Sequence, residues 1–119
     1  EFADGHGYGY LDGEARGVPE APATVHVLEC KTHNAKSFRE TKAKGVALAK
    51  PEHFAQVQVY MHLRARPRAL YLFVNKDDDE VWCERIEYDP RVAGDLMAKA
   101  ARIVAADRPP ARVRETDGF

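Results

Sequence analysis

Long apolar runs, cysteine and a surplus of charge of either sign are all scarce in this sequence of 119 residues. The chain holds two cysteines and one tryptophan, and its formal net charge is −1. No apolar stretch approaches the roughly 20 residues of a membrane-spanning helix, and no basic segment followed by an apolar one resembles a secretory signal. We therefore expect no membrane partner and take a cytoplasmic location as the default.

The two cysteines and five histidines lack the spacings of familiar disulfide or metal sites. Cys30 and Cys83 lie far apart and form no C-x-x-C pair, and the histidines show neither an H-E-x-x-H nor an H-x-x-x-H pattern. A disulfide framework and a dedicated zinc centre are therefore not expected. The cysteines are predicted to be reduced thiols.

The rest of the composition is that of an ordinary globular protein. Charged residues make up 31% of the chain and apolar residues 45%, which excludes a disordered tail or a fibre. We predict a single domain over residues 1–119. Because the first residue is Glu1 and not methionine, we expect the chain to be a fragment of a longer one.

The near-zero net charge conceals an uneven distribution along the chain. Residues 31–76 carry ten lysines and arginines against two acids, Glu40 and Glu52, whereas residues 1–30 and 77–95 are acidic. A basic middle segment can face a polyanion such as nucleic acid, but clustered charge is also typical of a solvated surface. Charge alone does not decide between these interpretations.

Apolar periodicity and turn residues predict an α/β (α+β) fold with a mixed central sheet flanked by helices. A strongly apolar strand after two helices is typical of a central, buried strand reached by a helical crossover. The predicted strands cover residues 7–13, 24–31, 68–75 and 80–88, and the predicted helices cover 35–44, 51–66 and a stretch from Pro90 that Pro109 and Pro110 stop.

Two acids and a lysine stand near the ends of the first two predicted strands. Alternation along residues 24–31 places Glu29 and Lys31 on one face, where we expect them at the edge of the core. If these strands pair, Asp12 lies close to Glu29, and two adjacent carboxylates favour a hard divalent cation between them. The backbone carbonyl of Cys30 is a candidate third ligand, and Lys31 can orient a water molecule or neutralise a phosphate.

Each of these features also has an ordinary structural explanation. Glu29 and Lys31 can form a surface ion pair of little energetic value, and Asp12 before Gly13 is common turn chemistry. On the predicted second helix, Gln56 and Tyr60 can be a flanking residue and a core aromatic. Only their joint occurrence in this order favours a catalytic site.

The joint pattern resembles the PD-(D/E)XK nuclease superfamily in its RecB-like, phage and CRISPR-associated exonuclease branch. The resemblance rests on GYLDG at residues 9–13, VLECKT at 27–32 and QVQVY at 56–60, which match Asp-Gly, Glu-x-Lys and Gln-x-x-x-Tyr motifs. It extends from residue 9 to about 89. The sequence that flanks the motifs is most similar to that of phage-encoded members.

The resemblance implies a restriction-endonuclease-like core and a Mg²⁺- or Mn²⁺-dependent deoxyribonuclease, exonuclease-like, of phage or prokaryotic recombination and repair. It implies metal ligation by Asp12 and Glu29, catalysis by Lys31, and a helix face of Gln56 and Tyr60 that helps to hold DNA. We expect the basic segment after Glu29 to add DNA contacts through Lys36, Lys42 and Lys44.

Three departures from the family pattern keep other functions open. Several relatives carry histidine where this chain has Tyr10, and His6 is a poor substitute. The N-terminal helix that opens the family core is missing before Glu1. The cysteines that bind an iron-sulfur cluster in some relatives do not follow residues 108–110, so no cluster is expected. The alternatives are a catalytically inactive nuclease-fold domain that binds DNA or a protein complex, and an RNA-directed or restriction-type endonuclease. Exonuclease or endonuclease action, strand polarity and oligomeric state stay open.

Overall fold

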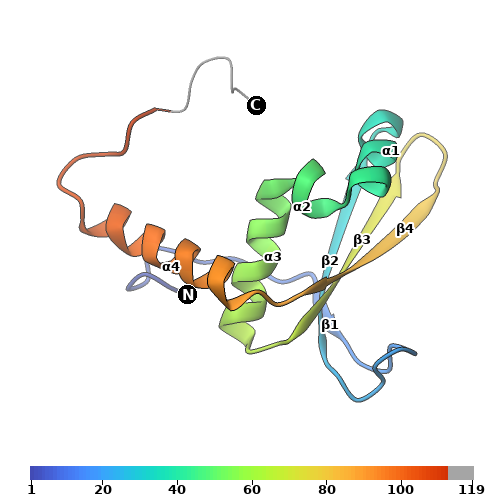
Figure 1. Cartoon of the computed structure of the whole chain (residues 1–119), viewed down its shortest axis with the longest axis horizontal. Coiled ribbons are helices and arrows are strands. Elements are labelled where there is room, and N and C mark those ends of the chain that lie inside the picture. Colours follow the sequence, from blue (N-terminus) through green and yellow to red (C-terminus); the bar gives the residue numbers. More distant parts are fainter. Residues whose placement is uncertain (113–119) are drawn as a thin grey trace.

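The computed structural model describes residues 1–112 and contains four strands and four helices (Figure 1). Among these residues, no helix is both long and apolar enough to cross a membrane. The strands are β1 (Gly13–Ala15), β2 (His26–His33), β3 (Arg68–Asn75) and β4 (Val81–Glu87), and the helices are α1 (Ala35–Lys44), α2 (Val46–Ala49), α3 (Pro51–Arg64) and α4 (Pro90–Ala105).

The strands form one mixed sheet in the order β1-β2-β3-β4. The central pair, β2 and β3, is parallel, and each edge strand is antiparallel to its neighbour. Helices α1, α2 and α3 connect β2 to β3, as a parallel pair requires. This mixed sheet flanked by helices confirms the predicted fold class.

Helices α1 and α3 cover one face of the sheet, and the core lies between these helices and the sheet. Its fully buried residues come from β2, β3, α1, α3 and the start of α2. Along β3, buried and half-buried residues alternate, with Tyr71 and Phe73 turned inward and Leu70 and Leu72 on the other face. The prediction of a central strand after a crossover is therefore confirmed, but β3 is fully buried on one face only, since no helix within residues 1–112 covers the other face.

The N-terminal strand predicted over residues 7–13 is wrong except for Gly13. Residues 7–12 form no strand, and Gly7 makes only an isolated bridge to Phe2. The β1–β2 ladder covers residues 26–28 of β2 and stops there, because the Asp12 carboxylate takes the backbone N–H of Cys30. A side chain thus replaces the next rung of the sheet.

A buried glutamine of α3, Gln58, joins this helix to the end of β4 and the connection that follows it. The Gln58 side chain donates to the Glu87 carbonyl at 2.9 Å and accepts from the Asp89 backbone N–H at 2.8 Å. Asp89 in turn caps α4 by accepting from the N–H groups of Arg91 and Val92. This set of bonds ties α3 to the end of β4 and to the start of α4.

Candidate active site

Asp12 is anchored beside Glu29 by the backbone of β2. It directly precedes β1, and its Oδ2 accepts the Cys30 N–H at 2.8 Å. Within a strand, the N–H and C=O of one residue point to the same side. The Cys30 carbonyl therefore faces the same edge as Asp12, beyond the last residue pair of β1 and β2, which is the position expected of a third ligand.

Glu29 lies deeper than the sequence suggested. Only 3% of the residue is exposed, so the expectation that it stands at the edge of the core is wrong. The reason is α3, which covers this face of β2. One carboxylate oxygen, Oε1, pairs with Lys31 Nζ at 3.1 Å, while the other, Oε2, is buried without a hydrogen-bond partner among the described residues.

The electrostatics of Glu29 fit a cation at this place. Burial raises the pKa of its carboxyl above the ordinary value, Lys31 opposes that shift, and the negative charge of Asp12 adds to it. A buried carboxylate oxygen without a partner is costly, and a divalent cation shared with Asp12 would relieve both the repulsion and the missing contact.

Within residues 1–112, no group of three or more His, Cys, Asp or Glu side chains gathers as a metal cage. The two carboxylates, Asp12 and Glu29, nevertheless meet the needs of Mg²⁺. This ion is usually bound through one or two carboxylates and keeps several of its own waters. The donor set of this chain therefore fits a hydrated hard cation and does not fit a fully protein-coordinated zinc.

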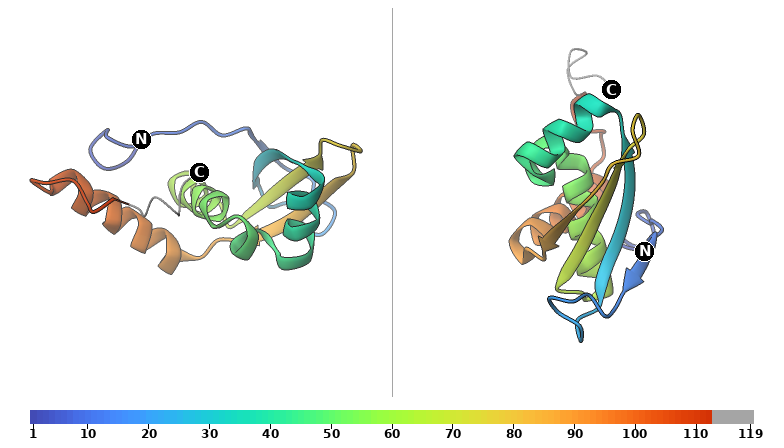
Figure 2. Two further views of the ribbon diagram at one scale, coloured as in Figure 1. Left: turned by 90° about the horizontal axis from the view of Figure 1, so that it is seen from above. Right: turned by 90° about the vertical axis from the view of Figure 1, so that its right-hand side faces the viewer.

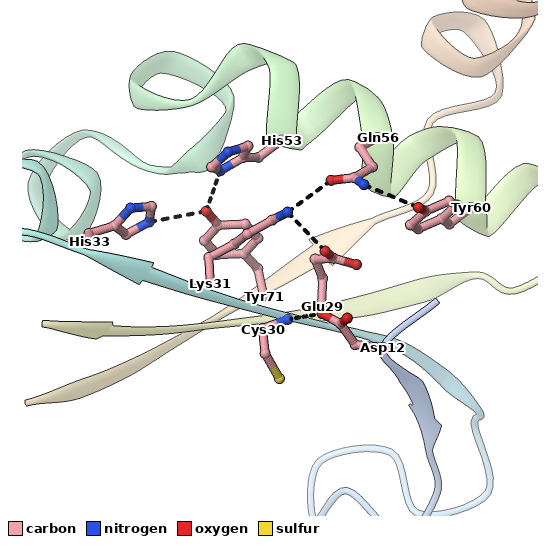
Figure 3. A network of polar contacts seen from close by, with 9 residues as sticks. All are labelled: Asp12, Glu29, Cys30, Lys31, His33, His53, Gln56, Tyr60 and Tyr71. Atoms are coloured by element: carbon pink, nitrogen blue, oxygen red, sulfur yellow. Dashed lines mark hydrogen bonds and ion pairs between the residues drawn. The ribbon is translucent and has the colours of Figure 1, made fainter. Parts of the chain in front are cut away.

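Lys31 connects the Glu29 carboxylate to α3. Its Nζ donates to Gln56 Oε1 at 3.2 Å, and Gln56 Nε2 donates to the Tyr60 hydroxyl at 3.1 Å (Figure 3). Gln56 and Tyr60 are one helical turn apart, which puts both on the face that meets β2. The three sequence motifs thus form one continuous polar network.

Two histidines and a tyrosine that sequence reasoning missed form a second hydrogen-bonded group beside this network. The buried Tyr71 hydroxyl lies 3.1 Å from His33 Nε2 and 2.6 Å from His53 Nδ1. Burial, together with the positive charge of nearby lysines, lowers the pKa of both histidines. His33 continues the alternation of Glu29 and Lys31, and His53 stands one turn before Gln56, so spacing was the available signal.

The basic residues of α1 lie apart from this network. Lys42 stacks 4.4 Å above the Trp82 ring and pairs with Glu80 at 3.5 Å, Lys44 pairs with Glu40 at 3.2 Å, and Lys36 is exposed. No described contact connects these three lysines to Glu29 or Lys31. Their predicted role in DNA binding stays a prediction about the surface of α1.

Comparison with known proteins bears on the fold alone. No family model matches the chain, and no curated protein matches it. The solved structure described as "Crystal structure of SSO0001" is similar, with 16% sequence identity and a TM-score of 0.51. The likeness covers 82% of this chain and 41% of that structure's chain, so this chain spans less than half the length of its structural neighbour.

Proposed function

We propose that this chain is a divalent-metal-dependent deoxyribonuclease that hydrolyses DNA phosphodiester bonds, exonuclease-like and of phage or prokaryotic DNA recombination and repair. The observation that carries the proposal is the buried Glu29 carboxylate, which has one oxygen paired with Lys31 and the other without a partner next to Asp12. The three matched motifs and their union in one network support it, as does the mixed four-stranded sheet with its parallel β2–β3 pair.

Asp12, Glu29 and the Cys30 carbonyl would hold Mg²⁺ or Mn²⁺. When bound, the ion supplies Lewis acidity toward the phosphate and lowers the pKa of a water molecule. Asp12 is kept in place by the Cys30 N–H, and Glu29 is kept in place by Lys31. Ligand positions are therefore set by the fold before a substrate arrives.

Lys31 has a donor to spare for the substrate. An ammonium group has three N–H donors, and the contacts within residues 1–112 use two of them, one to Glu29 and one to Gln56. The third can reach a phosphate oxygen or the attacking water, where its positive charge offsets the negative charge that develops during hydrolysis. Gln56 fixes the direction of the ammonium through its own bond to Tyr60.

The test is cleavage of end-labelled duplex and single-stranded DNA in Mg²⁺ or Mn²⁺, with EDTA as the metal-free arm. We expect wild-type protein to degrade DNA only with the metal, and Lys31→Ala to lose at least about 100-fold in rate, as is typical when a transition-state donor is removed. The matched control is Lys99→Ala, which removes an exposed lysine on α4. Equal rates for wild type and Lys31→Ala would overturn catalysis at this site.

The same assay separates this function from the non-catalytic alternative. A DNA-binding domain would retain DNA in a salt-dependent manner, because phosphate neutralisation alone gives a steep salt slope. It would show no metal-dependent cleavage under any condition. An RNA substrate of the same sequence, assayed in parallel, distinguishes a deoxyribonuclease from an RNA-directed enzyme.

A further inference from the structure

A cavity of about 280 Å³ opens between the N-terminal segment and α3, next to the proposed active site. Its walls include the aromatic rings of Phe2, Tyr8 and Tyr60, and its polar groups come from Gln56 and Glu52. The two views of Figure 2 show the N-terminal segment along α3, on the side opposite α4. The cavity is close to the lower end of the roughly 300–1,000 Å³ typical of small-ligand pockets.

Two glycines, Gly7 and Gly9, allow the close contacts that fix the N-terminal segment around this cavity. A Cβ atom on Gly9 would lie 2.7 Å from the Tyr60 hydroxyl, so the segment touches α3 there through bare backbone. The Phe2 ring folds over Gly7, to which Phe2 is bonded by two backbone hydrogen bonds of 2.9 and 3.0 Å. The aromatic wall is thus built by local backbone contacts and not left to a loose terminus.

Tyr8 presents its ring to solvent at the cavity, with 71% of the residue exposed. Its neighbour Tyr10 is 83% exposed, and the two rings meet edge to face at 6.2 Å. Large exposed aromatic rings that gather beside a cavity are typical of binding surfaces. Flat, unpaired nucleobases stack on such rings whatever their sequence, as in single-strand binding proteins.

The charges of the cavity indicate a base and not a phosphate. Glu52 is the charged residue among the described residues that line it, and a carboxylate repels phosphate but accepts N–H groups from a base edge. The cavity borders the candidate active site, since Gln56 and Tyr60 line it and also belong to the Lys31 network. A base held here would lie beside Gln56, whose side-chain oxygen accepts from Lys31.

We propose that this cavity binds an unpaired nucleobase of the strand being cut, with Tyr8 as the stacking residue, so that the enzyme prefers single-stranded or frayed DNA. The inference rests on the proposed function and deepens it, because it names the substrate class. Phe2 and Tyr60 line the same cavity, and the Glu52 carboxylate would accept from N–H groups of the base.

The test compares two fluorescent oligodeoxynucleotides of equal length, one mixed in sequence and one abasic, by anisotropy in Ca²⁺, which does not support cleavage. Both carry the same phosphates, so only the bases differ. We expect wild-type protein to bind the base-containing strand about tenfold more tightly, the size of one stacking contact. Tyr8→Ala should abolish this ratio, whereas Tyr8→Phe, which keeps the ring, should retain it.

Val81→Ala is the matched control, since Val81 is an apolar residue that is 53% exposed on β4 and lines no part of this cavity. The proposal is overturned if wild type binds both strands equally, if Tyr8→Ala keeps the ratio, or if Tyr8→Phe loses it. Cleavage of the same base-containing strand in Mg²⁺ is measured separately. If the protein prefers the base-containing strand but does not cleave it, the nuclease proposal fails and the base site stands. If it cleaves DNA but binds both strands equally, the base site fails and the nuclease proposal stands.

Discussion

Among the residues of this chain, the most informative are those that are polar and yet buried. Tyr71 lies in an apolar run of β3, and its sequence context is that of an ordinary core aromatic. Its hydroxyl, however, is hydrogen-bonded to the imidazoles of both His33 and His53. A phenol has one proton to donate, so one histidine nitrogen accepts it and the other donates to the oxygen. Tyr71 thereby fixes the orientation of two rings that border Lys31.

Tyr71→Phe tests this arrangement by removing the hydroxyl and keeping the ring. We expect a loss of about 1–2 kcal/mol in the free energy of unfolding, since two polar groups are left without a partner in a buried place. Urea denaturation monitored by circular dichroism measures it. The matched control is Tyr88→Phe, which removes a single tyrosine–histidine bond of 2.8 Å at an exposed position and should cost well under half as much. Equal losses would mean that the Tyr71 hydroxyl is not bonded as described.

Residue spacing allowed part of this site to be predicted and concealed the rest. Glu29 and Lys31 share a face because side chains alternate along a strand, and this was evident in the sequence. The burial of Glu29 was not evident, since it depends on α3 lying across β2. His33 and Tyr71 escaped notice because they meet only when β2 pairs with β3, a contact between distant parts of the chain.

At the scale of elements, local signals and tertiary contacts contributed unequally. Helix α1 and strand β3 have the predicted bounds, since Asn34 caps the helix and an apolar run marks the strand. The four-residue α2 was not predicted, and the N-terminal strand was wrong, because β1 depends on its partner and not on its own composition. Short strands with few rungs are decided by tertiary contacts.

An ion-pair cluster joins the three-residue strand β1 to the end of α3, close to Asp12 of the candidate site. Glu14 accepts from Arg64 and Arg66 at the end of α3, and these bonds lower the pKa of its carboxyl. A carboxyl with a depressed pKa in the folded state stabilises the protein above its ordinary value of 4.5, and this contribution is lost as the pH falls through the folded value. Because Asp12 directly precedes β1, the cluster also helps to position it.

Glu14→Gln should therefore lower the melting temperature at pH 7 by a few degrees. The difference from wild type should shrink as the pH falls below 4.5, because wild type then loses the same interaction. Thermal unfolding between pH 3 and 7 follows both proteins. Glu40→Gln, which affects an exposed pair within α1, is the control and should change little. A gap as large at pH 3 as at pH 7 would exclude an electrostatic origin.

For the whole molecule, the placement of charge matters more than its sum. The net charge of −1 combines acids at the proposed metal site with basic residues that follow it in sequence. Without a cation, Asp12 and Glu29 present negative charge at the place where the proposed function brings a phosphate. A divalent ion reverses the local field and removes this repulsion.

We therefore expect divalent ions to strengthen DNA binding as well as to permit cleavage. Addition of Ca²⁺ at constant ionic strength should raise the affinity for an end-labelled oligonucleotide several-fold. Filter binding or anisotropy measures it, with Na⁺ as the compensating ion. The double variant Asp12→Asn with Glu29→Gln should bind DNA equally well with and without Ca²⁺. A fall in wild-type affinity on addition of Ca²⁺ would contradict the proposed site.

The parallel pairing of β2 with β3 has a consequence for how the protein is made. The β3–β4 hairpin can close locally, whereas β2 must wait for α1, α2 and α3 to be synthesised and folded before it meets β3. Glu29 therefore gains Tyr71 as its neighbour only after β3 has left the ribosome, and Lys31 gains Gln56 only after α3 has done so. The proposed nuclease site is therefore incomplete in the nascent chain, and the proposed activity would begin with completion of the central sheet.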